Sequence, residues 1–284
     1  TPKVRVVENG PVRVSLEILR EAAGSTFIQE LRLSEGASAD RLEFHTVIDW
    51  RSKNTLLKAA FPLAASNPKA TYDLGIGAIQ RGNNIPTLYE VPAQQWADLT
   101  DASGKSGVAL MSDCKYGWDK PADNILRLTL LHTPSTSGHY DDQAWLDIGR
   151  HEMVYALQAH AGDWPADNRV VWRAAQFNQP PLAFQTQAHP GDLGKTFTFG
   201  NVNTSQVAIR ALKKAENSDE VVIRLQELAG KDAKGVEVSL AKRIASAREV
   251  NGAEEAMGPA EVRDGRLVAD LTRKGTRDGD STVS

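Results

Sequence analysis

Two pairs of aspartates are the first residues in this sequence that could carry out chemistry. Asp98 with Asp101, and Asp113 with Asp119, lie in segments that also contain Gly and Ser. Hydrolysis of a glycosidic bond uses one carboxyl group to attack or to activate water and another to donate a proton. Aspartates in such segments, however, mostly bond nearby backbone N–H groups in turns. We therefore predict turn-forming aspartates on loops and keep a catalytic pair as the alternative.

A metal site is the second possibility. The densest group of metal-binding side chains consists of His132, His139, Asp141, Asp142, His151 and Glu152. Zinc sites are recognised by fixed spacings such as HExxH or paired CxxC, and the sequence contains neither. A polar loop between two strands is therefore the favoured interpretation of this group.

Residues 113–118, with the sequence Asp-Cys-Lys-Tyr-Gly-Trp, differ from their surroundings. They place an acid, a base and two aromatic residues directly after the apolar run at 108–111. Aromatic faces stack on sugar rings, and charged or amide groups bond vicinal hydroxyls. The segment therefore has the chemistry of a carbohydrate contact. The alternative is that Tyr116 and Trp118 pack at an interface with another domain.

Other catalytic motifs have little support. The sequence contains no Gly-x-Ser-x-Gly elbow, and Cys114 has no partner motif, so we interpret it as a buried or half-buried structural thiol. Gly75 and Gly77 lack the third glycine and the following helix of a dinucleotide site. Close strand packing or a β-bulge is the expected role of these two glycines.

The composition excludes several classes of protein. The 284 residues carry 33 basic and 36 acidic side chains with a formal net charge of -3, so no strong positive field would attract a nucleic acid. No apolar run reaches the roughly 18–20 residues that cross a bilayer, so no membrane association is expected. The single cysteine excludes an internal disulfide and suits a reducing compartment, so we expect a cytoplasmic protein.

Apolar and polar residues alternate over many short runs, which indicates half-buried strands. Such runs are centred on residues 12–18, 42–50, 126–130, 153–157, 207–211, 221–225 and 236–240. Helical spacing is weak, and its best candidate, residues 242–255, is interrupted by Asn251-Gly252. The sequence therefore predicts an all-β protein whose antiparallel sheets pack face to face.

Several segments together match a known pattern. They are residues 72–81, 90–99 and 107–118, supported by 57–63, 149–157, 162–164, 209–216 and 221–228. Their order and spacing resemble the C-terminal β region of family 38 glycoside hydrolases, the α-mannosidases, and in particular the cytosolic, vacuolar and bacterial branch. The resemblance covers most of the chain.

The resemblance implies a specific domain organisation. A large β-sandwich of the galactose-mutarotase-like type is expected over residues 1–195, and a smaller β-sandwich over residues 196–272. The boundary near 195 follows a Pro- and Gly-bearing stretch, residues 179–192, in which alternation lapses. Residues 273–284 carry charge, Gly and Ser without apolar anchors, so a flexible tail is expected there.

The resemblance also implies a function for a larger parent protein. Such a parent hydrolyses terminal α-D-mannosides with retention at a zinc-assisted site, whose ligands and nucleophile lie upstream, in domains that this sequence does not contain. We therefore expect no catalytic residue, no metal ligand and no cofactor in this chain, with zinc held by the upstream domain. The chain alone would then be inactive.

In the related mannosidases, loops of this β region help to wall the glycan pocket. By that resemblance Asp113, Lys115 and Tyr116 are the expected substrate contacts. The implied partners are the upstream catalytic domain and mannose-containing glycans, and a homo-oligomer is left open. A chain with this role should expose an apolar surface for the catalytic domain. The alternatives are a stand-alone carbohydrate-binding or scaffold protein and, less favoured, a sugar epimerase using His and Glu.

Overall fold

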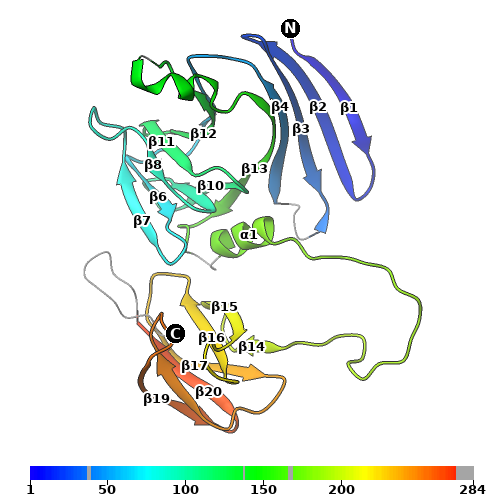
Figure 1. The fold of residues 1–284 in the computed structure, drawn as a ribbon, viewed down its shortest axis with the longest axis vertical. Coiled ribbons are helices and arrows are strands. Elements are labelled where there is room, and N and C mark those ends of the chain that lie inside the picture. The colour runs from blue at the N-terminus through cyan, green and yellow to red at the C-terminus, as the bar shows by residue number, and fades with distance from the viewer. Residues whose placement is uncertain (37–39, 137, 166–168, 273–284) are drawn as a thin grey trace. The chain divides into compact units, whose positions relative to one another are not determined.

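The computed structural model describes residues 1–36, 40–136, 138–165 and 169–272 of the chain (Figure 1). The chain divides into two compact units: unit 1 contains residues 1–166 and 170–180, and unit 2 contains residues 167–169 and 181–284. The predicted boundary near residue 195 falls within the stretch between Asn178 and Gly200, which contains neither strand nor helix, and it remains a prediction. The predicted tail, residues 273–284, lies outside the described residues.

Unit 1 is built almost entirely from strands. These are β1 (Lys3–Asn9), β2 (Arg13–Ala22), β3 (Ser25–Ser34), β4 (Arg41–Trp50), β5 (Thr55–Pro62), β6 (Lys69–Asp73), β7 (Ala78–Gly82), β8 (Val91–Pro92), β9 (Trp96–Thr100), β10 (Ser106–Ser112), β11 (Gly117–Ala122), β12 (Ile125–Thr133) and β13 (Gly149–Ala161). A 3-10 helix, η2 (Gly138–Trp145), follows β12, and the helix α1 (Arg169–Asn178) follows β13.

The strands of unit 1 form two antiparallel sheets. The large sheet has the order β1-β2-β3-β4-β13-β10-β9-β6-β7, and the small sheet has the order β5-β12-β11-β8. Side chains from both sheets form one hydrophobic cluster, which includes Trp50, Tyr72 and Leu110 from the large sheet and Trp118 and Leu128 from the small sheet. Two sheets that bury their facing side chains in this way form a β-sandwich. The all-β prediction is confirmed.

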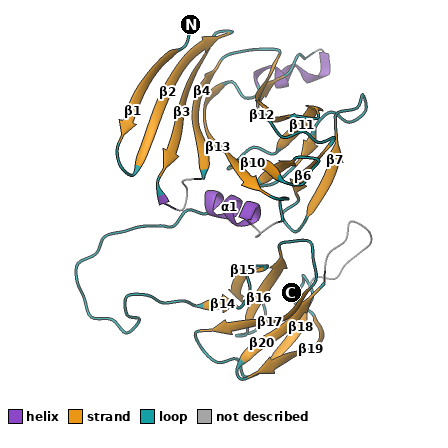
Figure 2. Ribbon diagram, turned by 180° about the vertical axis from the view of Figure 1, so that it is seen from behind, coloured by secondary structure: helices purple, strands orange, loops and turns teal. Residues whose placement is uncertain are grey.

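Within the described part of unit 1, no sheet covers the end of the large sheet formed by β1–β3. Figures 1 and 2 show β1–β3 to one side of the small sheet, and among the described residues the core cluster contains none from β1 or β2. Val6 pairs with Leu16 and Leu16 pairs with Leu31, so these side chains share the face that farther along the sheet becomes the core. We call this part of the sheet the uncovered face. Its exposed apolar residues are Val4 (61% exposed), Val6 (63%), Val14 (43%), Leu16 (42%) and Leu33 (46%).

The opposite face of the large sheet carries charged side chains at β1–β4. Helix α1 covers part of this face. Arg5 pairs with Glu17, and Arg41 pairs with Glu43. Helix α1 buries Val170, Val171 and Ala174 along one side, and the Phe177 ring lies 5.2 Å from the Arg41 guanidinium carbon.

Unit 2 contains two smaller sheets. Its strands are β14 (Gly200–Val202), β15 (Val207–Lys214), β16 (Val221–Glu227), β17 (Ala233–Leu240), β18 (Ala247–Val250), β19 (Ala256–Arg263) and β20 (Arg266–Leu271). Five of them form a sheet in the order β14-β17-β20-β19-β18, and β15 pairs with β16. A core cluster of Val207, Ala233, Val236 and Leu271 includes side chains from both sheets.

The helices depart from the sequence prediction. Residues 242–255, the best helical candidate, contain the strand β18 instead. The helix α1 was not predicted, although Val170, Val171 and Ala174 show the spacing of one helix face. No helix among the described residues is long and apolar enough to cross a membrane.

Candidate functional site

Residues 72–81 and 90–99, two of the segments that carry the family resemblance, meet at the turn between β6 and β7. The Asp73 carboxylate accepts hydrogen bonds from the backbone N–H groups of Gly75 (2.8 Å) and Gln95 (2.9 Å). Gly75 has φ +83°, a conformation that favours glycine, so it serves a hairpin turn and not the close packing or bulge predicted for it. This turn is therefore fixed to the start of β9, which lies beside β10 in the large sheet.

The three predicted substrate contacts lie together in the turn between β10 and β11. The Lys115 backbone N–H donates to Ser112 Oγ (3.0 Å), and the Val154 N–H donates to Asp113 Oδ2 (3.1 Å). The Tyr116 carbonyl accepts from the Ala93 N–H (3.0 Å), while the residue is 54% exposed. One internal bond and bonds from Val154 and Ala93 thus hold the turn in place, and an aromatic ring remains accessible on it.

Cys114 lies in the same turn and is exposed, which corrects the buried or half-buried position predicted for it. The residue follows the end of β10, so its side chain leaves the sheet where the core ends. Local desolvation and the neighbouring Asp113 carboxylate raise the pKa of its thiol to about 12. The thiol is therefore protonated near neutral pH and is a poor nucleophile.

The four aspartates of the possible catalytic pairs each have partners of their own. Asp101 accepts from the backbone N–H groups of Ser103 (2.9 Å) and Ser66 (3.1 Å), which is the predicted turn role. Asp98 and Asp119 were also expected on loops, but they lie in β9 and β11 and are buried. The Gly- and Ser-bearing sequence that suggested loops begins only beyond these strands.

Asp98 forms a buried pair with His160, a residue that the sequence analysis did not select. His160 Nε2 lies 2.6 Å from Asp98 Oδ2, and the Thr100 hydroxyl donates to Asp98 Oδ1 at 2.6 Å. Burial lowers the pKa of His160, but the hydrogen bond and charge of Asp98 outweigh burial and raise the pKa above its ordinary value. The only sequence signal was Gly107, which pairs with both Thr100 and His160 and leaves space for the imidazole.

Asp119 belongs to a charged cluster on the small sheet. Its carboxylate pairs with Arg127 and accepts from Asn84 Nδ2 at 3.1 Å, and Lys58 Nζ lies 3.6 Å away. Lys58 also pairs with Glu90 at 3.3 Å. Burial raises the pKa of Asp119, but its bonds to Arg127 and Asn84 outweigh burial and lower the pKa. The cluster is two acids balanced by two bases, and the lowered pKa of Asp119 keeps its carboxylate from serving as a proton donor.

Lys120 is a further buried polar residue that the sequence analysis missed. The residue is 1% exposed, and its Nζ donates to Asn83 Oδ1 (2.6 Å) and to the Ala122 carbonyl (2.9 Å). Burial lowers the pKa of its ammonium group. Its position after Trp118 and Asp119 in β11 gave no signal, because a lysine in a strand is usually exposed.

The metal-binding residue types do not converge. Among the described residues, no group of three or more His, Cys, Asp or Glu side chains could hold a metal ion. His151 Nε2 lies 2.7 Å from the Asp147 carbonyl oxygen, and the Asp147 carboxylate accepts from the His132 backbone N–H at 2.7 Å. These contacts fix the loop that contains η2. The described residues thus do not fit a zinc ion.

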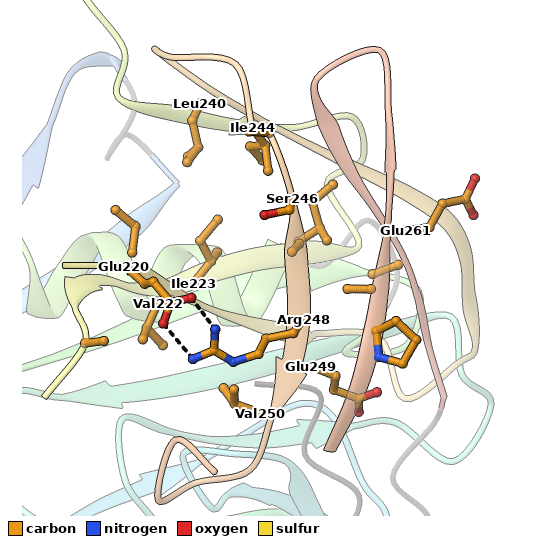
Figure 3. A pocket seen from close by; sticks show the side chains of 18 of the residues that line it. Glu220, Val222, Ile223, Leu240, Ile244, Ser246, Arg248, Glu249, Val250 and Glu261 are labelled. Carbon is orange, nitrogen blue, oxygen red and sulfur yellow. Dashed lines mark hydrogen bonds and ion pairs between the residues drawn. The ribbon is translucent and has the colours of Figure 1, made fainter. Parts of the chain in front are cut away.

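Unit 2 contains a cavity of about 710 Å³ between its two sheets. Apolar side chains, including Val222, Ile223, Leu240 and Val250, line it. Glu220, just before β16, forms an ion pair with Arg248 of β18 (Figure 3). From residue 200 onward the sequence contains no Phe, Trp or Tyr. This cavity therefore lacks the aromatic faces on which sugars stack.

Comparison with protein families gives two matches along the chain. Residues 1–143 match the glycosyl hydrolases family 38 C-terminal domain, and residues 206–275 match the glycosyl hydrolases family 38 C-terminal beta sandwich domain. The first match alone covers half of the chain and includes the turn that carries Asp113, Lys115 and Tyr116.

Similar proteins are several times longer than this chain. Alpha-mannosidase 2C1 of Mus musculus is 33% identical over 221 residues, which is 75% of this chain and 20% of that protein. An alpha-mannosidase of Saccharomyces cerevisiae is 32% identical over 183 residues, or 62% of this chain and 16% of that protein. The chain thus spans about a fifth of the length of the curated relatives it matches.

A solved structure shares the fold. The crystal structure of an alpha-mannosidase from Enterococcus faecalis V583 superposes with a TM-score of 0.77 over 94% of this chain and 35% of that chain. Its sequence identity is 16%, so the likeness concerns the arrangement of strands.

Proposed function

This chain belongs to the family 38 glycoside hydrolases, whose C-terminal β region it represents, and we propose that it is the non-catalytic β portion of an α-mannosidase. The parent enzyme hydrolyses terminal α-D-mannosides with retention at a zinc-assisted site in an upstream domain. This portion completes the wall of the substrate pocket and stabilises the catalytic domain. The solitary cysteine supports a cytoplasmic location.

The uncovered face of the large sheet is the observation that carries the proposal. Monomeric proteins seldom leave a contiguous apolar surface of more than several hundred Å² open to water. Val4, Val6, Val14 and Leu16 lie on neighbouring strands and are each more than 40% exposed. We assign the upstream domain of the same polypeptide as the partner that covers them. The sequence analysis expected an exposed apolar surface of this kind.

The proposal that the upstream domain, and not this chain, carries out catalysis is tested by measuring the release of an aryl leaving group from an aryl α-mannoside. The chain alone is compared with the chain mixed with the upstream polypeptide and zinc. Activity only in the mixture supports the proposal. Activity of the chain alone contradicts it, because its own carboxylates would then perform the hydrolysis. No activity in either sample, together with no complex of the two polypeptides on size-exclusion chromatography, favours a stand-alone binding or scaffold protein.

The covering role is tested with two matched substitutions in this chain, each variant being mixed with the upstream polypeptide. Leu16 is 42% exposed on the uncovered face, and Ile28 is 39% exposed on the opposite face of the neighbouring strand. Leu16→Asp should dissociate or destabilise the complex of the two portions, since it buries a charge in the interface. Ile28→Asp should leave the complex intact. Equal effects of the two substitutions on complex formation would refute this assignment.

The predicted contacts Asp113, Lys115 and Tyr116 complete the proposal. Their fixed turn and the accessible Tyr116 ring support a place at the wall of the glycan pocket. Lys115→Ala and Tyr116→Ala should each lower the kcat/KM of the parent roughly tenfold, equivalent to one lost polar or stacking contact, without changing its melting temperature. Unchanged kinetics in both variants would remove these residues from the site.

A further inference from the structure

The two sheets of unit 1 differ in width. Among the described strands, nine form the large sheet and four form the small sheet. Side chains that meet across the sandwich show how the two are aligned. Phe61 of β5 packs edge-to-face on Phe44 of β4 with ring centroids 5.9 Å apart, and Trp118 of β11 lines one cavity of about 220 Å³ with Tyr72 of β6. The edge strand β5 therefore lies over β4, and its free edge points toward β3, β2 and β1.

One row of side chains on the large sheet shows where the cover ends. Each residue of this row pairs with the next one on the neighbouring strand, in the order Val6, Leu16, Leu31, Phe44 and Tyr155. Directly paired residues point to the same face of a sheet. Along the row the exposed fraction falls from 63% at Val6 and 42% at Leu16 to 4% at Tyr155. The small sheet thus covers the row at β13 and β4 and stops before β2 and β1.

The free edge of β5 presents backbone groups that no strand of this chain bonds. Among the described residues, β5 pairs with β12 alone. In an antiparallel pair, alternate residues bond the neighbouring strand, and the residues between them direct N–H and C=O to the other side. Leu63 continues the register of β5 and its N–H donates to the Asn124 carbonyl at 2.8 Å, so the residues two and four positions earlier also bond β12. The N–H and C=O groups of Ala60 and Lys58 therefore point to the free edge.

The edge of β1 is a poorer template for pairing than the edge of β5. The register of β1 shifts between Val6 and Glu8, and such a β-bulge twists an edge and interrupts pairing. The strand β5 is eight residues long, and the extra residue of its pair, Leu130, lies in β12. A strand added to β1 would widen the large sheet and cover nothing. A strand added to β5 would lie over the apolar face of β3.

We propose that the upstream polypeptide supplies extended strands to this chain, of which the first pairs with the free edge of β5 and the others continue the small sheet over Leu31, Leu16 and Val6. This inference rests on the proposed function, since the partner is the same polypeptide. Strands in a sheet lie about 4.8 Å apart, so roughly three of them would cover β1–β3. Every second residue of these strands should be apolar, because alternate side chains face the large sheet.

The pairing is tested by hydrogen exchange of single amides, measured by mass spectrometry with electron-transfer fragmentation. The full 284-residue chain is compared with its complex with the upstream polypeptide. The amides of Ala60 and Lys58 should exchange at least roughly tenfold more slowly in the complex, because they gain backbone acceptors there. The amide of Ala59 is the internal control. It already bonds β12, so its exchange should change much less than that of Ala60.

The outcomes separate this inference from the proposed function. Absence of a complex on size-exclusion chromatography would overturn both, because no upstream partner would then cover the chain. A complex in which the amides of Ala60 and Lys58 exchange as fast as in the chain alone would overturn the strand pairing only. The upstream domain would then cover the uncovered face with a helix or a loop, neither of which bonds the backbone of β5.

Two proline substitutions at free edges provide matched variants. Ala60→Pro removes an N–H that bonds no strand of this chain, so the isolated variant should melt close to the wild type, while its complex should weaken at least roughly tenfold. Gln80 is likewise exposed, on the edge strand β7. The Leu74 N–H donates to the Gly77 carbonyl, so by the same alternation the Gln80 N–H points away from β6. Gln80→Pro should leave the affinity of the complex unchanged.

Equal affinities of the Ala60→Pro and Gln80→Pro variants for the upstream polypeptide would overturn the assignment of β5 as the pairing edge. The melting temperature of each isolated variant is measured first. If Ala60→Pro does not fold, the amide exchange of the wild-type complex decides between pairing and simple covering.

Discussion

The two units of this chain build facing sheets from very different side chains. Unit 1 contains all six tryptophans and all five tyrosines of the sequence, and its core buries Trp50 and Trp118 to 1% and 0% exposure. The strands of unit 2 contain no aromatic residue, and a cavity of about 710 Å³ lies between its sheets. Large aromatic side chains bury more apolar surface per residue than Val or Ala.

The difference indicates how the two units can contribute to function. Unit 1 has an aromatic-rich core, polar groups held in defined positions and an uncovered apolar face, and that face is the part of it that we assign to a partner domain. Unit 2 has a small aliphatic core of Val207, Ala233, Val236 and Leu271 and few fixed polar groups inside it. We expect its packing to be more tolerant of change than that of unit 1.

The largest predicted effect is the loss of stability when a core side chain is truncated, and it compares the cores of the two units directly. Trp50 is 1% exposed, and its Nε1 donates to Thr133 Oγ1 at 2.8 Å. Trp50→Ala should lower the free energy of unfolding of unit 1 by about 3–5 kcal/mol. Leu271→Ala in unit 2 should cost only about 2–3 kcal/mol, because a leucine side chain buries less apolar surface than a tryptophan side chain.

Both effects can be measured in one urea titration. The remaining tryptophan fluorescence reports unit 1, and hydrogen exchange with mass spectrometry reports unit 2, which lacks tryptophan. The exposed Trp145, at 62%, is the control, and Trp145→Ala should change stability much less than Trp50→Ala. A larger loss of unfolding free energy for Leu271→Ala in unit 2 than for Trp50→Ala in unit 1 would contradict this prediction.

The next effect concerns the close packing around the buried His160–Asp98 pair. A Cβ atom at Gly107 would lie 2.6 Å from His160 Cε1 and 2.9 Å from Thr100 Cα. Gly107→Ala should therefore displace the imidazole and destabilise unit 1 by about 2–3 kcal/mol. Gly77→Ala is the matched control, since its Cβ would meet no atom within 4 Å. Equal melting temperatures of these two variants would contradict the proposed packing.

The same substitution, alanine to valine, should lower the free energy of unfolding in unit 1 and raise it in unit 2. Ala97 is 0% exposed in the filled core of unit 1, and Ala269 lines the cavity of unit 2 on β20. Ala97→Val should cost about 1–2 kcal/mol through overpacking, whereas Ala269→Val should stabilise unit 2 by roughly 0.5–1 kcal/mol by filling space. Calorimetry combined with hydrogen exchange separates the units. A loss of stability in both variants would show that the cavity is not free to accept the extra methyl groups.

The smallest effect is a pH dependence confined to unit 1. The pKa of His160 is raised in the folded state, so its protonated form stabilises the fold. That contribution is complete below the ordinary histidine pKa of about 6.5 and is lost as the pH rises through the folded pKa. The free energy of unfolding of unit 1 should fall over this window, and a His160→Gln, Asp98→Asn double variant should lack the fall.

Unit 2 provides the internal control for this pH series. Its strands, from residue 200 onward, contain no histidine, so its hydrogen-exchange protection should stay flat over the same window once corrected for intrinsic exchange. A parallel decline in both units would mean that a group other than His160 causes the dependence.

Much of the fold was predictable because strand alternation is a local property. The runs at 42–50, 126–130 and 221–225 became β4, β12 and β16. The turn with Asp113, Lys115 and Tyr116 was also predictable, since an apolar run ends just before it. The predictions for Cys114, Asp98 and Asp119 were wrong because sequence context does not specify where a strand ends or which side chains a neighbouring element covers.

The sequence by itself determined the all-β class, the family resemblance and the segments that carry polar and aromatic residues. Its period-two pattern gives every strand an apolar face, whether or not another sheet covers that face. Only the tertiary structure decided that the apolar face of β1 and β2 is open while that of β4 is buried. It also decided that Tyr72 from the large sheet and Trp118 from the small sheet share one cavity, because that contact depends on how the two sheets pack and not on spacing along the chain.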